Sequence, residues 1–254
     1  MKKQFFLLFS IISFGIFVFS AVQFIRIDLA QKQSDRDFRT LREQAEMQEG
    51  SQNQTATSQS ASDQKYRALA EQNPDFIGWI RVDGTKIDYP VMQKKDDPEY
   101  YLEHNFEKEY DARGVPFLDG QCDLQQSDQY VLYGHHMRDG SMFADLMKFT
   151  DPSFCEAGHL ITFDTLNESA TWQPVMVFKI SADRLSNFPY HEFVNFSSEG
   201  LTAEDFISRC KLYAIWSDES ADLTDAKLLS LSTCEYSYGN GRLVVVAKKI
   251  ESTG

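Results

Sequence analysis

Residues 228–250, LLSLSTCEYSYGNGRLVVVAKKI, decide how this chain folds and what it can do. Two runs rich in leucine and valine flank the polar, glycine-containing segment 235–241. This pattern predicts a pair of antiparallel β-strands joined by a loop longer than the tightest hairpin turns. Cys234 closes the first run and Arg242 opens the second. The hairpin therefore places a thiol and a guanidinium at the same end.

A cysteine and an arginine at one strand end can support acyl-transfer chemistry if a base is nearby. A thiol attacks as the thiolate or when a base takes its proton, and a permanently charged guanidinium can hold a developing oxyanion. The predicted strand 130–133 (YVLY) stops at Gly134 and delivers His135 and His136. A histidine at the end of a strand lies on the rim of a fold, so the missing base is expected there.

Three motifs in a fixed order resemble the class B sortases. They are YGHHMRDGSMF at 133–143, LSTC at 231–234 and Arg242, eight positions after Cys234. The resemblance extends from about residue 66 to residue 250. It implies an eight-stranded β-barrel, with helices before the barrel and a helix in the long connection that precedes the penultimate barrel strand.

The same resemblance implies a reaction and its residues. Sortases cleave a C-terminal sorting signal after threonine through a thioester and join the protein to an amine of peptidoglycan, of its lipid-linked precursor or of a pilin. Carried over by motif, the nucleophile is Cys234, the acid and base is His135, with His136 as the alternative, and the oxyanion group is Arg242. The predicted substrate-binding residues are Ser232, Thr233, Glu235, Asn105 and Tyr190. Asp139 either forms a turn with Gly140 or orients the histidine.

Composition excludes several other classes of protein. The chain has 254 residues, 42% of them hydrophobic, and a net charge of −13, which argues against nucleic-acid partners because phosphate binding needs basic surfaces. No nucleotide-binding or metal-ligand pattern occurs, so no cofactor and no metal are expected. Cys122, Cys155 and Cys210 are interpreted as small apolar core residues, with at most one disulfide among them if Cys234 stays free.

The first 62 residues predict a membrane anchor and a stalk. Lys2 and Lys3 precede an apolar run over 5–25, which is long enough to span a bilayer, and they predict a cytoplasmic N-terminus. A cleaved signal peptide ending near Ser20 is the alternative. We expect residues 1–27 to form the anchor, 28–62 a charged and then low-complexity flexible stalk, and 63–254 the catalytic domain. The resemblance and the anchor together place that domain outside the cell membrane.

The remainder of the chain alternates short β patterns with turns, which predicts a closed or sandwich-like β architecture with a few helices. Helices are expected at 63–72, 98–104, 141–149 and 202–210, the last with Thr202 and Asp205 as a capping box. Strands are expected at 79–82, 86–92, 115–118, 130–133, 160–163, 175–180, 211–216 and in the hairpin.

Three functions from different classes fit these observations. The first is a membrane-anchored cysteine transpeptidase acting on a sorting-signal-bearing surface protein and a wall amine. The second is a secreted cysteine endopeptidase that uses the same thiol. The third is a non-catalytic wall-binding β module in which the Cys–His–Arg cluster is incidental. Papain-like proteases are disfavoured because their cysteine precedes their histidine, whereas here His135 comes first.

Overall fold

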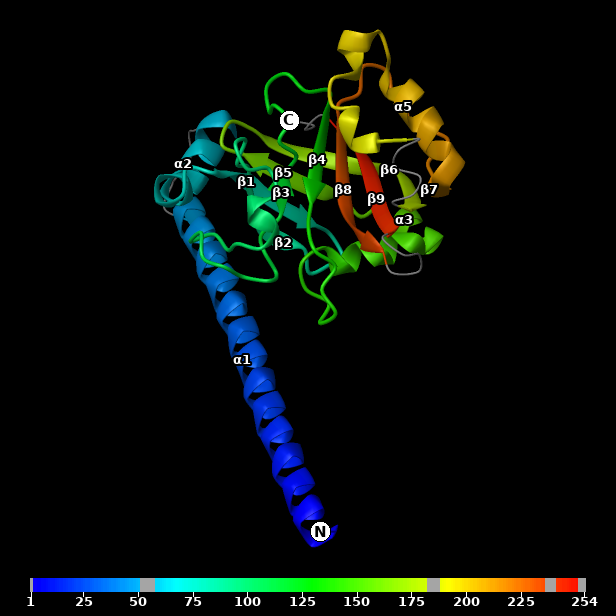
Figure 1. The fold of residues 1–254 in the computed structure, drawn as a ribbon. Helices are drawn as coiled ribbons and strands as arrows, with labels where there is room; N and C mark the ends of the chain where they lie inside the picture. Colours follow the sequence, from blue (N-terminus) through cyan, green and yellow to red (C-terminus); the bar gives the residue numbers. More distant parts are fainter. Residues whose placement is uncertain (1, 51–57, 182–187, 236–240, 251–254) are drawn as a thin grey trace. The chain divides into compact units, whose positions relative to one another are not determined.

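A computed structural model of the chain describes residues 2–50, 58–181, 188–235 and 241–250. The chain divides into two compact units, residues 1–43 and 44–254. Helix α1 (Lys2–Gly50) makes up the first unit and continues into the second. All β-strands belong to the second unit, which Figure 1 shows as a barrel with short helices around it.

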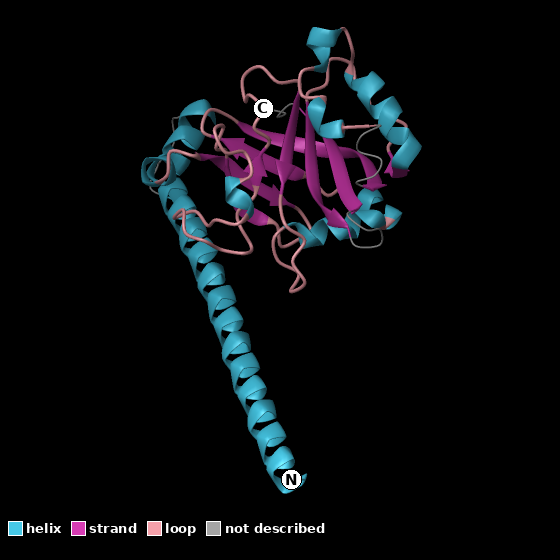
Figure 2. Cartoon of the chain, in the orientation of Figure 1, coloured by secondary structure: helices cyan, strands magenta, loops and turns pink. Residues whose placement is uncertain are grey.

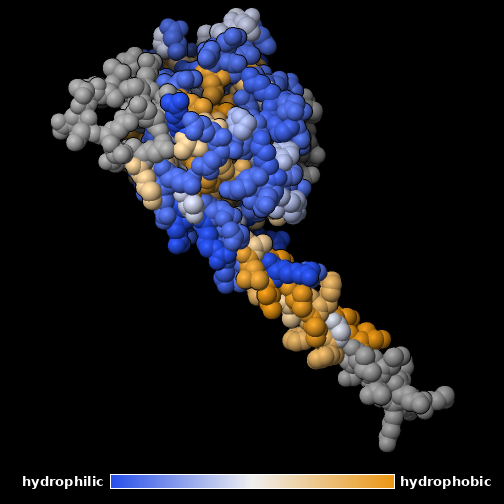
Figure 3. All heavy atoms as spheres, turned by 90° about the vertical axis from the view of Figure 1, so that its left-hand side faces the viewer, coloured by the Kyte–Doolittle hydropathy of each residue, from blue (hydrophilic) through white to orange (hydrophobic). Residues whose placement is uncertain are grey.

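The first unit contains an apolar helical segment. Between Ile12 and Met47, α1 contains a segment of mean hydropathy 1.6 whose residues are not buried, so by length and composition this helix could cross a membrane. Phe14, Phe17 and Phe24 are among its most exposed side chains. Figure 3 shows apolar surface gathered along this part of α1, whereas the coloured surface of the other unit that faces the viewer is mostly hydrophilic.

The second unit is a closed barrel. Its strands are β1 (Phe76–Val82), β2 (Asp88–Met92), β3 (Phe117–Leu118), β4 (Gln129–Tyr133), β5 (Ile161–Thr165), β6 (Ser169–Ser181), β7 (Ala214–Ser217), β8 (Leu228–Glu235) and β9 (Gly241–Ile250). They are hydrogen-bonded in the order β5-β1-β2-β3-β4-β8-β9-β6-β7, and a further β5–β6 pairing closes the first eight into a barrel. This is the predicted sortase-type eight-stranded barrel, with β7 added outside it on β6.

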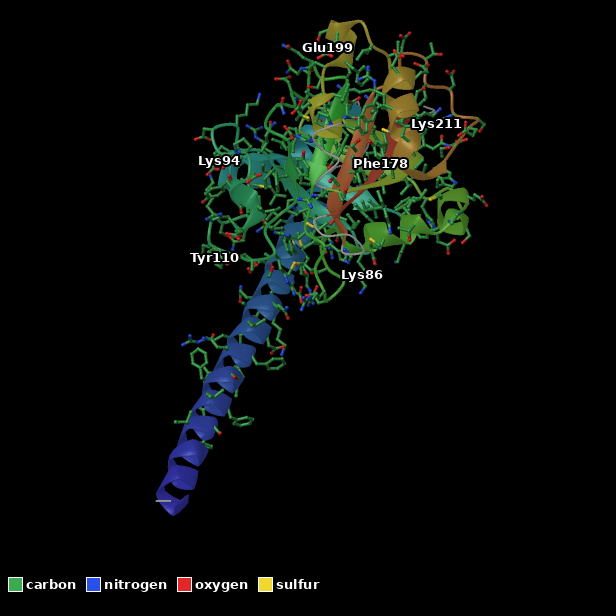
Figure 4. All side chains as sticks on the ribbon, turned by 45° about the vertical axis from the view of Figure 1, so that its right-hand side comes forward. Lys86, Lys94, Tyr110, Phe178, Glu199 and Lys211 are labelled. Carbon is green, nitrogen blue, oxygen red and sulfur yellow. The ribbon has the colours of Figure 1, made fainter. Side chains whose placement is uncertain are left out.

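Aromatic and branched side chains fill the barrel, as strand propensity predicts. Tyr130 on β4 packs edge-on against Phe163 of β5 and Trp172 of β6, with ring centroids 6.1 and 5.9 Å away. Phe178 on β6 is also completely buried, and Figure 4 shows it among the strands. This core fixes the rim on which the candidate site lies.

The helices lie outside the strands (Figure 2). They are α2 (Ser58–Gln72), η1 (Tyr100–Leu102), η2 (Phe143–Thr150), α3 (Pro152–Glu156), η3 (Tyr190–Glu192), η4 (Phe196–Glu199), α5 (Ala203–Cys210) and η5 (Lys211–Tyr213). Helix α5 begins with the predicted capping box: the Thr202 side chain accepts from the Asp205 backbone N–H, and the Asp205 carboxylate accepts from the Thr202 N–H. It lies in the connection between β6 and β8, where the family resemblance placed a helix.

Several element boundaries differ from the sequence predictions. Residues 28–50 belong to α1, and α2 begins at Ser58, so residues 58–62, expected in a flexible stalk, are helical because Ser, Gln and Ala are compatible with a helix. Residues 51–57, also assigned to that stalk, lie outside the described residues. The helix expected over 141–149 is a 3₁₀ helix, η2, and strand β7 starts at Ala214 because η5 occupies 211–213.

Candidate active site

Cys234 and Arg242 face each other across a pair of strands. β8 and β9 are antiparallel, and Cys234 is the direct register partner of Arg242. Directly opposite residues in such a pair have Cβ atoms about 4.5–5.5 Å apart on the same face of the sheet. The Arg242 guanidinium donates to the Gly241 carbonyl at 3.1 Å. The prediction that the hairpin brings thiol and guanidinium together is confirmed.

His135 reaches the same end of the barrel from the other side of β8. Strands β4 and β8 are parallel, with Tyr133 paired to Ser232. The pairing continues beyond β4, because Gly134 N–H donates to the Ser232 carbonyl at 3.2 Å and the Thr233 hydroxyl donates to the Gly134 carbonyl at 2.7 Å. The chain therefore arrives at His135 beside the end of β8 that carries Cys234.

The two neighbouring histidines have different partners. Nε2 of His135 lies 2.8 Å from the Leu102 carbonyl, whereas Nδ1 of His136 lies 3.0 Å from the backbone carbonyl of Cys234. A carbonyl oxygen only accepts, so each of these nitrogens carries a hydrogen. In neutral His135 the other nitrogen, Nδ1, is then the free base. His135 lines a cavity together with Cys234 and Arg242, whereas His136, also a described residue, is outside that lining.

The cavity has a volume of about 330 Å³ and brings together segments that are distant in sequence. The last residue of η1, Leu102, and the segment around β3, with Phe117 and Asp119, contribute to its wall, and η3 contributes Tyr190 and His191. Residues at the ends of β4, β8 and β9 also line the cavity. A thiol, an imidazole and a guanidinium thus meet in one hollow large enough for part of an extended peptide.

Ser232, Thr233 and Tyr190, three of the predicted substrate-binding residues, line this cavity. All three are almost completely buried, and the Tyr190 hydroxyl shares a hydrogen bond of 2.7 Å with the Ser232 hydroxyl. Burial raises the pKa of Tyr190 to about 12, against its ordinary value of 10.0. The phenol therefore stays protonated at neutral pH.

The other two predicted substrate-binding residues are placed differently. Asn105 is described, but it lies outside the cavity lining, and its side chain accepts from the Glu109 backbone N–H at 2.8 Å in a turn. Glu235 is the last residue of β8, paired with Gly241, and its side chain lies outside what the structure describes. A groove role for either residue stays a prediction.

Sequence reasoning named Asn105 from the segment 98–120 but missed the residues of that segment that line the cavity. The Leu102 backbone carbonyl bonds to His135, and the Asp119 carboxylate accepts from the Tyr133 hydroxyl at 2.9 Å. Burial also raises the pKa of Tyr133 above its ordinary value. A backbone carbonyl leaves no residue-type signal, although the position of Asp119 directly after a strand was a usable one.

Cys234 differs from the other three cysteines in its exposure. All four cysteines lie among the described residues and are free; Cys234 is half-buried, whereas Cys122, Cys155 and Cys210 are buried. Burial raises the pKa of Cys122 to about 12 and that of Cys155 to about 11, which makes their thiols poor nucleophiles. The prediction that these three are core residues agrees with their burial.

Asp139 lies in the loop that follows His135. Its carboxylate accepts from the Ser141 N–H and hydroxyl, which makes a turn, and pairs with Arg113 at 2.7 Å. Partial burial opposes ionisation, but the Ser141 hydrogen bonds and the Arg113 charge lower the pKa of Asp139 below its ordinary value. The turn prediction for Asp139 is confirmed.

Residues 80–250 match the family model described as the sortase domain. The chain belongs to the sortase family. It is 33% identical over 187 residues to sortase B of Listeria monocytogenes, covering 72% of this chain and 73% of that protein. It is 30% identical over 190 residues to sortase B of Staphylococcus aureus, covering 74% and 75%.

Solved structures agree with this assignment. The structure of a Staphylococcus aureus sortase B–substrate complex superposes with a TM-score of 0.73 at 26% identity, covering 89% of this chain and all of that one. The relatives and the barrel together identify a class B sortase-type cysteine transpeptidase, as the three sequence motifs predicted.

Proposed function

We propose that Cys234 is the nucleophile, His135 the general acid and base, and Arg242 the oxyanion-stabilising group of this sortase. The observation that carries the proposal is the strand register: Cys234 lies directly opposite Arg242 on β9, and the β4–β8 pairing delivers His135 to the same cavity. In the sequence His135 lies 99 residues before Cys234, so the barrel is what brings the histidine to the hairpin.

In the first half-reaction, the Cys234 thiol gives its proton to His135, and the sulfur attacks the carbonyl carbon of a peptide bond. The carbonyl oxygen takes up negative charge, which the Arg242 guanidinium stabilises because its charge is permanent. As the tetrahedral intermediate collapses, the C–N bond breaks, and His135 gives a proton to the leaving amine. The products are a thioester on Cys234 and a released C-terminal peptide.

In the second half-reaction, an amine attacks the thioester carbon. His135, now neutral, takes a proton from that amine, the C–S bond breaks, and the sulfur leaves as the thiolate. Water could resolve the same thioester, which would make the protein a peptidase. Membership of the sortase family supports resolution by an amine of peptidoglycan, its lipid-linked precursor or a pilin.

The proposed substrate is the sorting signal of a surface protein, cleaved after threonine. Tyr190, Ser232 and Thr233 wall the cavity beside Cys234 and are proposed to contact the signal. Asn105 and Glu235 are proposed to contact it farther along the groove. A related Staphylococcus aureus sortase B has been solved as a substrate complex, which supports a peptide site on this fold.

We further propose that α1 anchors the enzyme in the cell membrane as a single span. Its apolar segment supports an anchor, and Lys2 and Lys3 before that segment favour a cytoplasmic N-terminus. The catalytic domain, residues 63–254, would then lie outside the cell, where surface proteins and peptidoglycan amines are found.

The test uses the full-length protein in detergent micelles with fluorogenic peptides of the Asn-Pro-x-Thr and Leu-Pro-x-Thr-Gly types, with and without an amine acceptor. Mass spectrometry identifies the products. We expect cleavage after threonine and acceptor-dependent ligation. Cys234→Ala should abolish both, and His135→Ala and Arg242→Ala should each lower kcat/KM by about 100-fold or more.

Matched controls separate catalytic roles from general damage. His159→Ala removes a histidine that stacks on Phe154, and Arg138→Ala removes an exposed arginine of the histidine loop; both should retain activity within about twofold. His136→Ala decides between the neighbouring histidines. Hydrolysis without ligation would establish a peptidase, and retained chemistry in folded Cys234→Ala would contradict the proposed nucleophile.

A further inference from the structure

His135 is oriented by a backbone carbonyl. Its Nε2 donates to the Leu102 carbonyl at 2.8 Å, and this hydrogen bond selects the tautomer in which Nδ1 is free to exchange a proton. A histidine that works as acid and base needs such an orienting acceptor. A backbone carbonyl cannot be removed by a substitution. Its role can therefore be tested only through the residues that hold it in place.

The Leu102 carbonyl is packed against Gly114. Residues 111–115 run beside 101–103, since Asp111 N–H donates to Glu103 and Val115 N–H donates to Tyr101, both at 2.9 Å. Gly114 has a φ of +56°, and a Cβ built on it would lie 2.5 Å from the Leu102 carbonyl oxygen and 2.2 Å from that of Tyr101. Any side chain here must displace those two carbonyls, so the approach requires glycine.

The residue next to Gly114 holds the loop that carries His135. The Arg113 guanidinium pairs with the Asp139 carboxylate at 2.7 Å, and the Arg113 side chain is only 5% exposed. Asp139 lies four residues after His135, and the loop is closed at its base by a 2.8 Å hydrogen bond from Phe143 N–H to the His135 carbonyl. Gly114 thus contacts the carbonyl that orients His135, and its neighbour Arg113 contacts the loop that carries His135.

We propose that Arg113 and Gly114 form a platform that sets the tautomer and orientation of His135, and that they are positioning residues for its proton transfers. Gly114 fixes the Leu102 carbonyl, and the Arg113–Asp139 ion pair fixes the loop, so that the acceptor and the ring cannot shift relative to each other. The inference rests on the proposed catalytic role of His135 and adds two residues that its motif does not contain.

The decisive variant is Gly114→Ala, and the chain offers a matched control. Gly158 also has a positive φ, +76°, but a Cβ on it would meet nothing within 4 Å. Gly158→Ala therefore adds the same kind of backbone strain without touching a carbonyl. Both variants are made in the full-length chain, and their thermal midpoints are measured so that the strain can be matched.

The first readout is independent of activity. A long-range ¹H–¹⁵N correlation spectrum of the imidazoles, with the His135 signals assigned by their loss in His135→Ala, should show the Nε2–H tautomer in the wild type and in Gly158→Ala. In Gly114→Ala we expect a mixture of tautomers. An unchanged His135 tautomer in folded Gly114→Ala would overturn the proposal. This readout decides the inference even if the wild type cleaves no sorting peptide, an outcome that would count against the proposed function alone.

The second readout is kinetic. Loss of an orienting partner typically costs about 10–100-fold, and here the loss should fall on kcat, with KM changed by less than about twofold, because the platform does not contact the substrate. Arg113→Met, which keeps most of the buried bulk, should show the same split, and Arg113→Lys should recover part of kcat. Equal losses of kcat in Gly114→Ala and Gly158→Ala would overturn the positioning role.

Discussion

Two buried tyrosines of this protein make hydrogen bonds of similar length in very different surroundings. Tyr66, on α2, donates to the Asp164 carboxylate of β5 at 2.8 Å. The same carboxylate accepts from the Arg81 guanidinium at 3.1 Å and from the Ser169 hydroxyl at 2.5 Å. This cluster contains charged groups and fastens α2 to the strands of the barrel.

Tyr190, on η3, has a neutral partner instead. Its hydroxyl bonds to Ser232 on β8, and its backbone carbonyl accepts from the buried Gln129 side chain at 3.2 Å, which in turn accepts from the Ser230 hydroxyl. Ser230, Ser232 and Cys234 alternate along β8 and so share one face. Similar hydrogen bonds therefore serve two purposes: a charged cluster supports stability away from the cavity, and a neutral one shapes the wall beside the thiol.

Removing the carboxylate at the centre of the charged cluster should have the largest effect. Asp164→Ala leaves the Tyr66 hydroxyl without its acceptor in a buried site, so we expect a loss of about 3 kcal/mol in the free energy of unfolding. The melting temperature should fall by roughly 6–12 °C. Thermal unfolding and the kcat/KM of the folded enzyme would be measured together. A drop in kcat/KM at temperatures where the variant is folded would contradict the claim that the charged cluster serves stability alone.

Tyr66→Phe deletes only the hydroxyl of the same cluster. A hydrogen bond to a charged group contributes about 1.5–3 kcal/mol, so we expect a loss of about 2 kcal/mol in unfolding free energy with unchanged kcat/KM. Chemical denaturation followed by tryptophan fluorescence provides the measurement. Tyr100→Phe, which removes an exposed hydrogen bond to the Lys108 carbonyl, is the control and should change stability by less than about 0.5 kcal/mol.

Tyr190→Phe also deletes one tyrosine hydroxyl, this time in the neutral cluster, and should affect activity more than stability. We expect about 1 kcal/mol of lost stability, and a several-fold fall in kcat/KM because Ser232 and the cavity wall lose their fixed positions. Ser232→Ala should act similarly, and the double variant should add little to either, since both remove one bond. If kcat/KM stayed unchanged in all three, the neutral cluster would be as purely structural as the charged one.

The smallest expected effect is a pH dependence. The pKa of Tyr190 is raised to about 12 by burial, so below pH 10 the phenol is protonated in both the folded and the unfolded chain. Between pH 10 and 12 the unfolded chain ionises first, and stability falls as pH rises. At about pH 10.5 this amounts to about 0.8 kcal/mol. The free energy of unfolding is measured at pH 8 and pH 10.5 for the wild type and Tyr190→Phe, and the variant should lack this part of the decline. Parallel pH profiles of stability for the two proteins would contradict the prediction.

Much of the site could be predicted because its main residues lie at the ends of strands that the sequence pattern indicates. The two leucine- and valine-rich runs on either side of the glycine-containing segment predicted the hairpin, and the hairpin fixes the pairing of Cys234 with Arg242. The capping box at Thr202 and Asp205 was likewise readable, since it depends on two side chains three residues apart. Local patterns of this kind determine the positions of their residues without help from distant parts of the chain.

The rest depends on backbone atoms and distant contacts. The Leu102 carbonyl that orients His135 lies at the end of η1, where side-chain chemistry gives no hint of that role. β6 runs from Ser169 to Ser181, far beyond the predicted 175–180, because it pairs with three other strands, so polar positions and Pro174 are retained within the sheet. Tertiary pairing decides such boundaries, and intrinsic propensity does not.

The parallel pairing of β4 with β8 has a consequence for how the enzyme comes to be active. Tyr133 and Ser232 are neighbours in space although about a hundred residues separate them, and closing so long a loop is slow. Cys234 itself lies on β8, so a nascent chain lacks this thiol until β8 has been synthesised. The proposed nucleophile therefore meets its proposed base only when the barrel has closed, which ties reactivity to successful folding.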